Sequence, residues 1–407
     1  MTLTSIDSAN RRARGAVSAL FLTNGALFAN MAPRLPELKG TFGLGEAAYG
    51  FLVIAWPIGA IIAGLAAGWL IRRFGSALVA VAGTMLTGVA LLAAGSAPSL
   101  ALLAAGFLFG GAMDAITDVA QNSHGLLVQR RYGRSILNSF HALWSVGAVL
   151  GGSMAAGAMA LNLSLSAHLG ISFIVFAAVA LIALKFCLPK DGSPAGIEVV
   201  SEDRPAAPSA GTERKTRNRT LWIMTALVLI STAGVVTEDA GNSWAALYLA
   251  DSLGTSASFA ALGYISLVGA QFVGRILGDG MVDRFGQRLV AQLGAVCLIL
   301  GMGLALAFPS VPGSVLGFAA AGFGVATLVP AAMEHADRLP GLAHGAGLSV
   351  VSLLMRVGFL ISPPLVGFVA EGWGLRMGLL LVPLVGVIVL LCSPVLRGKK
   401  AHRRLQP

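Results

Sequence analysis

Charged side chains are scarce in this chain of 407 residues. Asp, Glu, Lys and Arg together make up 11% of the sequence, and hydrophobic residues make up 56%. A soluble domain carries about 25% charged residues, and the mean hydropathy of this chain is +0.81. The composition therefore excludes a water-soluble globule and indicates a protein whose main solvent is lipid.

Cysteine is also scarce, and the motifs of common enzyme sites are missing. Cys187, Cys297 and Cys392 each stand alone in an apolar run, so they predict neither a disulfide framework nor a metal site. The sequence has no Walker loop, no paired zinc ligands and no nucleophile elbow. We therefore expect no catalytic residue, no metal and no cofactor, and the sequence argues against an enzyme and against ATP-driven transport.

Long apolar runs fill most of the chain. A helix that crosses a bilayer needs about 20 mostly apolar residues. Twelve segments meet this requirement, at roughly 16–33, 47–71, 76–95, 99–123, 136–161, 166–187, 221–249, 258–282, 288–308, 312–334, 343–370 and 375–396. The first is long enough to span and lacks a small-residue cleavage pattern, so it does not resemble a signal peptide. The predicted fold class is an all-α membrane protein with twelve transmembrane helices.

The net charge of +10 is distributed unevenly over the loops. Basic residues gather before the first span, in alternate loops after it, in the central loop and in the C-terminal tail, for example Arg11, Arg12, Arg14, Arg130, Arg131 and Arg134. Loops rich in Lys and Arg stay on the cytoplasmic side. This pattern predicts a multi-pass protein of the cytoplasmic membrane with both termini in the cytoplasm. Because topology explains the basic balance, we expect no nucleic-acid partner.

The chain repeats itself at an offset of 211 residues (284 minus 73). Residues 73–78 (RFGSAL) recur as residues 284–289 (RFGQRL). The same offset relates Gly106 to Gly317, Gly111 to Gly322 and Gly147 to Gly358. The repeat predicts two pseudo-symmetric six-helix bundles, residues 1–188 and 221–407, joined by a flexible cytoplasmic linker at 189–220 that has too few apolar groups to fold alone. Many secondary transporters are built in this way, with a substrate site between the halves. One duplicated chain supplies both halves, so a monomer is expected to suffice.

The loop after the second span carries a family motif. Residues 68–75 (GWLIRRFG) resemble the signature of the major facilitator superfamily, and residues 283–288 (DRFGQR) are similar to it in their charges as well. The resemblance covers nearly all twelve spans and implies that superfamily's fold. In the superfamily this loop acts as a gate latch, which implies gating roles for Arg72, Arg73, Gly75, Asp279, Asp283 and Arg284. Arg72 stands where the signature usually has an acid, and Asp279 where it usually has a glycine.

Three segments further resemble the fucose-permease-like branch of this superfamily. They are residues 118–122 (DVAQN) in the fourth span, 138–141 (NSFH) in the fifth and 242–244 (NSW) in the seventh. The first span has no acid around residues 30–33, where fucose permease has one. Fucose itself is therefore not the expected substrate.

Acidic residues within the spans are the first candidates for chemistry, because a charge inside the membrane costs about 2.5–3.5 kcal/mol on insertion scales. Asp114, Asp118 and Asn122 follow one another at intervals of four and share one face of the fourth span. Two carboxylates this close do not both ionise readily in a low dielectric, so one of them is expected to carry a proton. The resemblance places Glu238, deep in the seventh span, opposite Asp118. We predict proton coupling through Asp118, Glu238 and Asp114, with a structural carboxyl as the alternative for each.

Polar and aromatic residues in the same spans are candidates for holding the solute: Asn122, Asn242, Trp244, Gln271, His141 and Arg356. For Trp244 an interfacial belt position is an equal alternative, and for His141 a packing role is the more common one. Arg356 is expected to pair with an acid or to bind an anionic group, because an unpaired buried charge is costly. Arg275 is expected to be structural and to meet Asp279 one turn away.

Two expectations concern structure more than chemistry. Arg34, Glu37 and Lys39 are expected to form a water-exposed cluster at the outer mouth. Pro363 and Pro364 are expected to break or kink the eleventh span, because proline removes an amide donor and clashes with the preceding turn.

These observations predict a secondary active transporter that moves a small organic solute by alternating access and is coupled to protons. Its partners are then the solute, protons and the lipid bilayer. Two alternatives remain open from the sequence. One is proton-driven efflux of a drug or metabolite, which Met113, Phe140 and Phe272 would suit. The other is a membrane sensor or scaffold without transport, for which the altered position Arg72 gives support.

Overall fold

The computed structural model describes residues 8–132, 136–189, 210–337, 339 and 346–396. Nearly all of this part is helical, and it contains no strand. Twelve helical stretches within it are long and apolar enough to cross a membrane. The prediction of an all-α membrane protein with twelve transmembrane helices is confirmed.

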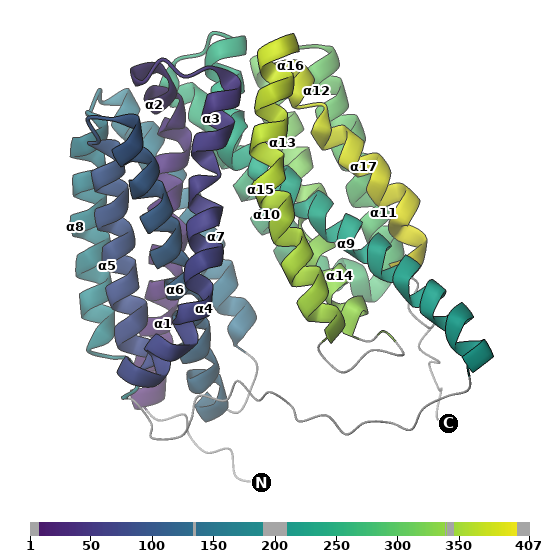
Figure 1. The fold of residues 1–407 in the computed structure, drawn as a ribbon. Helices are drawn as coiled ribbons and strands as arrows, with labels where there is room; N and C mark the ends of the chain where they lie inside the picture. Colours follow the sequence, from purple (N-terminus) through teal and green to yellow (C-terminus); the bar gives the residue numbers. More distant parts are fainter. Residues whose placement is uncertain (1–7, 133–135, 190–209, 338, 340–345, 397–407) are drawn as a thin grey trace.

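The first six spans form one bundle (Figure 1). Its helices are α1 (Ser8–Met31), η1 (Ala32–Arg34), α2 (Leu35–Thr41), α3 (Glu46–Val53), α4 (Ala55–Phe74), α5 (Ser76–Gly95), α6 (Leu100–Tyr132), α7 (Leu137–Ala160) and α8 (Leu165–Leu184). The first span comprises α1, η1 and α2, and the second comprises α3 and α4. We call this bundle the N-half.

The last six spans form the second bundle, which we call the C-half. Its helices are α9 (Ala210–Leu247), η2 (Tyr248–Ser252), α10 (Ala257–Phe285), α11 (Gln287–Cys297), η3 (Leu298–Met302), α12 (Gly303–Ala307), α13 (Val311–Val325), α14 (Leu328–Asp337), α15 (Ala346–Trp373), α16 (Leu375–Gly378), α17 (Leu381–Cys392) and η4 (Ser393–Leu396). The segments η2 and η3 are π-helical turns that continue their spans.

The duplication read from the sequence also governs how helices pack within each half. A Cβ added to Gly111 would lie 2.0 Å from the backbone oxygen of Trp56, and one added to Gly322 would lie 2.0 Å from that of Leu267. The offset from Trp56 to Leu267 is the same 211 residues (267 minus 56). Small residues let membrane helices approach this closely. Both halves therefore contain the same tight crossing of their second and fourth spans.

The loop that carries the family signature has the same backbone in both halves. Gly75 ends α4 with φ +88°, and Gly286 ends α10 with φ +81°. A side chain is strained in this region of φ, which favours glycine at a helix C-terminus. The two copies of the motif thus end their helices and reverse the chain in the same way.

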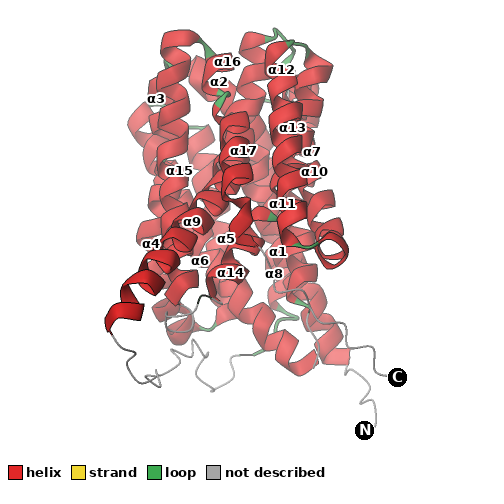
Figure 2. Cartoon of the chain, turned by 90° about the vertical axis from the view of Figure 1, so that its right-hand side faces the viewer, coloured by secondary structure: helices red, strands yellow, loops and turns green. Residues whose placement is uncertain are grey.

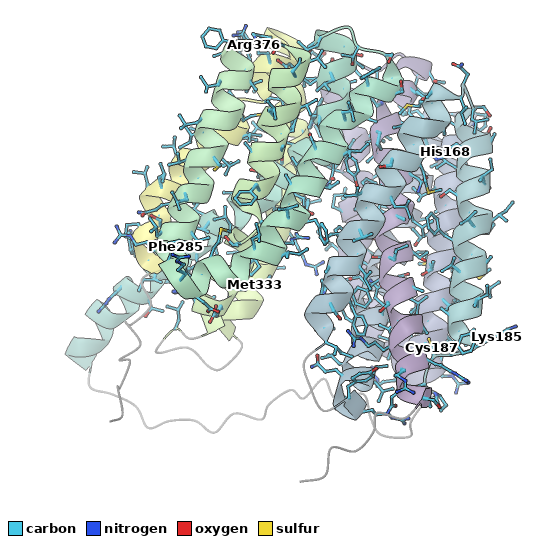
Figure 3. The ribbon with its side chains drawn as sticks, turned by 180° about the vertical axis from the view of Figure 1, so that it is seen from behind. His168, Lys185, Cys187, Phe285, Met333 and Arg376 are labelled. Atoms are coloured by element: carbon cyan, nitrogen blue, oxygen red, sulfur yellow. The ribbon has the colours of Figure 1, made fainter. Side chains whose placement is uncertain are left out.

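The two ends of the molecule differ in charge. The helices α4, α6 and α10 finish at one end of the molecule, where α9 begins (Figures 1 and 2). We call it the basic end because Arg72, Arg130 and Arg284 lie in the last turns of those helices. Figure 3 shows Lys185 near this end and Arg376 at the other. Figure 1 shows the halves close together at the opposite end and diverging toward the basic end.

Two structural expectations need correction. α9 begins at Ala210, so the last part of the predicted linker is helical, because its Glu, Lys and Arg residues favour helix and extend the seventh span. The rest of the linker, residues 190–209, lies outside the described residues. The predicted break in the eleventh span is wrong, because α15 runs unbroken through Pro363 and Pro364; a kink stays a prediction. Neighbouring helices can compensate for proline in a membrane helix, and here the backbone of Pro363 packs against Gly50 of α3.

Candidate functional site

Asn24 is the centre of a hydrogen-bond network inside the N-half. Its amide nitrogen donates to Asp114 Oδ1 at 2.7 Å. Its amide oxygen accepts from Gln121 Nε2 at 3.2 Å and from Trp144 Nε1 at 2.9 Å. One side chain on α1 therefore fixes residues of α6 and α7, and it holds the Asp114 carboxyl in place.

Asp118 lies one turn further along α6 and is exposed. Its Oδ1 accepts from Asn122 Nδ2 at 3.0 Å and from Gln121 Nε2 at 3.4 Å. Among the described residues no Lys or Arg lies within ion-pair distance of this carboxyl. Asp118 is thus a carboxyl that amide groups hold and that the surroundings can reach.

Glu238 is the matching acid of the C-half, on α9, and its side chain is 22% exposed. Gln271 of α10 donates to its Oε2 at 3.1 Å. The guanidinium of Arg275, one turn from Gln271, lies 3.8 Å from the same oxygen. Unlike Asp118, this acid has a cation beside it, the guanidinium of Arg275. The expected contact of Arg275 with Asp279 stays a prediction. The side chain of Asp279 lies outside the described part of the structure.

Arg275 also reaches across to the N-half. Its Nη1 donates to Ser145 Oγ of α7 at 3.5 Å. His141, one turn from Ser145, is exposed and lies within electrostatic range of both Arg275 and Asp118. Contacts therefore link Glu238 to Ser145 of α7 through Arg275, and His141 interacts with Asp118 only electrostatically.

Arg356 of α15 is the last residue of this polar cluster. It is exposed and lies within electrostatic range of Asp118. We call the set the central polar group: Asp114, Asp118, Asn122, His141, Glu238, Gln271, Arg275 and Arg356. Four of them, Asp118, His141, Arg275 and Arg356, are exposed.

The structure does not bring Trp244 to this layer. Its side chain is fully buried, and its ring meets the ring of Tyr49 edge-on at 4.9 Å. Neither placement considered for it, against a solute or in an interfacial belt, matches this packing between the halves. Asn242, one turn from Glu238 on α9, is half-buried.

Ion pairs and hydrogen bonds close the molecule at the opposite end. Lys39 Nζ lies 3.0 Å from Glu46 Oε1 in its own half and 3.0 Å from Asp251 Oδ2 in the other. Tyr49 donates to the backbone oxygen of Ser243 at 2.5 Å. These bonds connect the N-half directly to the C-half.

The prediction that Arg34 belongs to a water-exposed cluster at this end is wrong. Arg34 is 3% exposed, forms two hydrogen bonds with Glu37 at 2.8 Å, and donates to the Leu163 oxygen at 2.9 Å. Closure of the opposite end removes it from the surface.

The predicted latch residues lie at the basic end, away from the central polar group. Arg72, Arg73, Asp283 and Arg284 are exposed at the ends of α4 and α10. The guanidinium of Arg284 lies over the ring of Phe285, 5.3 Å from its centroid.

Sequence reasoning missed Asn24, Gln121, Trp144 and Ser145, and it assigned Arg275 a minor role. Neutral amide and hydroxyl groups inside a span carry little signal, because insertion costs single out charges. One usable signal was the i,i+3 spacing of Asp118 and Gln121 on one helix face. Among the described residues no group of three or more His, Cys, Asp or Glu side chains is arranged to hold a metal.

Comparison with known proteins fits this architecture. The uncharacterized transporter y4wD of Sinorhizobium fredii is 29% identical over 381 residues, which cover 94% of this chain and 97% of that protein. Membrane protein MosC of Rhizobium meliloti is 28% identical over 392 residues, covering 96% and 91%. A bacterial homologue of the human lysosomal transporter Spinster, solved in an inward-facing and occupied conformation, superposes with a TM-score of 0.71 at 15% identity, covering 95% of this chain and 98% of that one.

The fold and the polar layer between its halves define a multi-pass membrane transporter. The Major Facilitator Superfamily profile matches residues 17–279 and 239–407. The chain belongs to the Major Facilitator Superfamily.

Proposed function

We propose that this transporter couples the movement of a small polar organic solute to the movement of protons, with Asp118 as the proton-carrying group. The observation that supports this most is the contrast between the two facing acids. Glu238 has the guanidinium of Arg275 beside it at 3.8 Å. Asp118 is held by amide donors alone at 3.0 and 3.4 Å, so it can exchange a proton without breaking an ion pair.

The proposed cycle uses the two halves as rocking units around the central polar group. The basic end faces the cytoplasm, since loops rich in Lys and Arg stay on that side. In this orientation, in the cytoplasmic membrane with both termini inside, the central polar group would be reached from the inside, and Lys39, Tyr49 and Asp251 would close the outside. The solute would be held by Asn122, Asn242, Gln271 and His141. Asp114 would stabilise the hydrogen bonds of Asn24 beside Asp118. One chain contains both halves, so a monomer is sufficient.

The polar character of the layer favours a hydrophilic solute over an apolar drug. Of the three apolar residues that would suit efflux, Phe140 is fully buried in the N-half and stacks on Phe21 with ring centroids 5.4 Å apart. It is therefore not available to line a drug site. The resemblance to the fucose-permease-like branch stays a prediction.

Proton flux in liposomes tests the proposal. The purified protein is reconstituted with an internal pH dye, and sugars, nucleosides, organic acids and drugs are added singly. We expect a solute-dependent pH change in the wild type that Asp118→Asn abolishes. Glu334→Gln serves as control, because Glu334 is an exposed acid that bonds Gln287 at the basic end. An unchanged pH response in Asp118→Asn would disprove the coupling role, and solute binding without flux would favour the sensor alternative.

A further inference from the structure

The position of Arg356 on α15 directs it toward the N-half. Pro363 and Gly367 follow it by seven and eleven residues and so lie on the same helix face. A Cβ on Gly367 would lie 2.5 Å from the backbone oxygen of Glu46, and one on Gly50 would lie 2.5 Å from that of Pro363. This face of α15 therefore packs on α3 at the opposite end, and toward the basic end it presents Arg356 to the space between the halves.

Arg356 is the charge in the central polar group without a close partner. Its guanidinium has no ion pair or hydrogen bond within the described residues, and it lies within electrostatic range of Asp118. Arg275, the other guanidinium of the layer, already has Glu238 and Ser145. Arg356 lies within the eleventh span, where an unpaired charge is costly, so an arginine without a partner at an accessible position indicates a ligand that arrives from outside the protein.

The charges of the layer set the sign of that ligand. Asp114 is bonded to Asn24 inside the N-half, so the charges that can reach a solute are the carboxyls Asp118 and Glu238 and the guanidinium groups of Arg275 and Arg356. With Asp118 ionised, these two carboxylates and two guanidinium groups balance. When Asp118 takes a proton, its negative charge is lost and Arg356 leaves the layer with one positive charge in excess. A solute with one negative charge restores the balance, whereas a neutral solute leaves the excess in a low dielectric.

We infer that the transported solute is an organic anion whose carboxylate is bound by Arg356 when Asp118 carries the proton. A guanidinium binds a carboxylate through two parallel hydrogen bonds. One proton and one monoanion then cross together, and no net charge moves. This inference rests on the proposed function and adds the class of the substrate.

Matched pairs of acids and amides test it. Liposomes receive nicotinate or nicotinamide, lactate or lactamide, and benzoate or benzamide, and the internal pH is followed. In parallel, phenylglyoxal modification of Arg356 is measured by peptide mass spectrometry with and without each solute. We expect at least one acid, and no amide, to change the pH beyond the change that passive entry of the acid causes in protein-free liposomes, and to slow modification of Arg356 at least threefold.

Variants of Arg356 separate binding from folding. We expect Arg356→Gln to lose the acid-dependent pH change, and Arg356→Lys to retain it with an apparent affinity about tenfold weaker, because lysine keeps the charge without the planar fork. Arg376→Gln is the control, since Arg376 bonds the Ala307 oxygen at the opposite end.

The outcomes distinguish this inference from the proposed function. An amide or other neutral solute that moves protons through Asp118, with Arg356→Gln still active, overturns the anion class and leaves the coupling intact. Failure of every acid both to protect Arg356 and to move protons also overturns it. A pH response to an acid that persists in Asp118→Asn contradicts the coupling itself.

Discussion

A single methyl group at Gly50 is expected to shift the molecule toward its other conformation. Gly50 lies on α3, and its neighbour is the backbone of Pro363 and Pro364 on α15, so the contact joins the two halves. A Cβ added there would lie 2.5 Å from the Pro363 oxygen and 3.1 Å from the Pro364 Cα. In Gly50→Ala the opposite end cannot close as it does in this structure.

The size of the shift follows from the overlap. Extra methyl groups in a packed contact cost about 1–3 kcal/mol. The cost applies only to the state in which α3 and α15 touch, so the equilibrium moves toward the state open at the opposite end. A difference of 1–3 kcal/mol corresponds to about 5- to 150-fold in population.

Cysteine accessibility measures this equilibrium. Cys187, Cys297 and Cys392 are replaced by serine, and Ser243→Cys is introduced as a reporter, because Ser243 is 5% exposed at the closed end. In right-side-out vesicles we expect a membrane-impermeant maleimide to label the reporter at least fivefold faster in the Gly50→Ala background.

Gly111→Ala is the matched control, because its Cβ would lie 2.0 Å from the Trp56 oxygen within the N-half. It is expected to lower thermal stability without raising reporter labelling. If Gly50→Ala folds normally and labels at the wild-type rate, the reading of this contact as a conformational gate is refuted.

Three further predictions concern the network and the fold. Asn24→Ala should lower the free energy of unfolding by about 1–3 kcal/mol, since it leaves Asp114 and the other partners of Asn24 unsatisfied. A melting temperature equal to that of the wild type would contradict a stabilising role of this hydrogen-bond network. Glu238→Gln and Arg275→Gln should each reduce the yield of folded protein, because each single change leaves an uncompensated charge. The double variant should recover that yield, and a yield below that of both single variants would argue against the pairing of Glu238 with Arg275. Gly75→Ala should destabilise the N-half by about 1–2 kcal/mol, which is the cost of a left-handed backbone for a residue with a side chain. Thermal unfolding measures this loss, and an unchanged transition would contradict the requirement for a positive φ at position 75.

The number of spans and the duplication could be predicted because both follow regular patterns in the amino-acid sequence. Apolar length specifies each span, and the 211-residue offset relates packing contacts as well as motif residues, as Gly111 and Gly322 show. The start of α9 could not be predicted in this way, because a charged helical extension at the membrane surface has no apolar pattern.

The candidate site was only partly predictable, because it does not follow the repeat. The counterpart of Asp118 in the C-half is Val329, and the counterpart of Glu238 in the N-half is Leu27. Charges such as Asp118, Glu238 and Arg356 stood out in the sequence.

Which charge pairs with which depends on helix rotation and on the conformation of the two halves. Trp244 illustrates this, because it lies on the same span as Glu238 yet packs against Tyr49 in the closed end. Sequence spacing alone does not predict that the two halves close at this end.

The measurement that tests the account most directly compares two modes of transport in Asp118→Asn liposomes. With the solute identified by the pH assay, accumulation driven by an imposed pH gradient is measured beside counterflow of labelled against unlabelled solute. The account predicts that Asp118→Asn loses gradient-driven accumulation and keeps counterflow, because the halves still rock around a bound solute but carry no proton. Full accumulation in this variant would contradict proton coupling through Asp118.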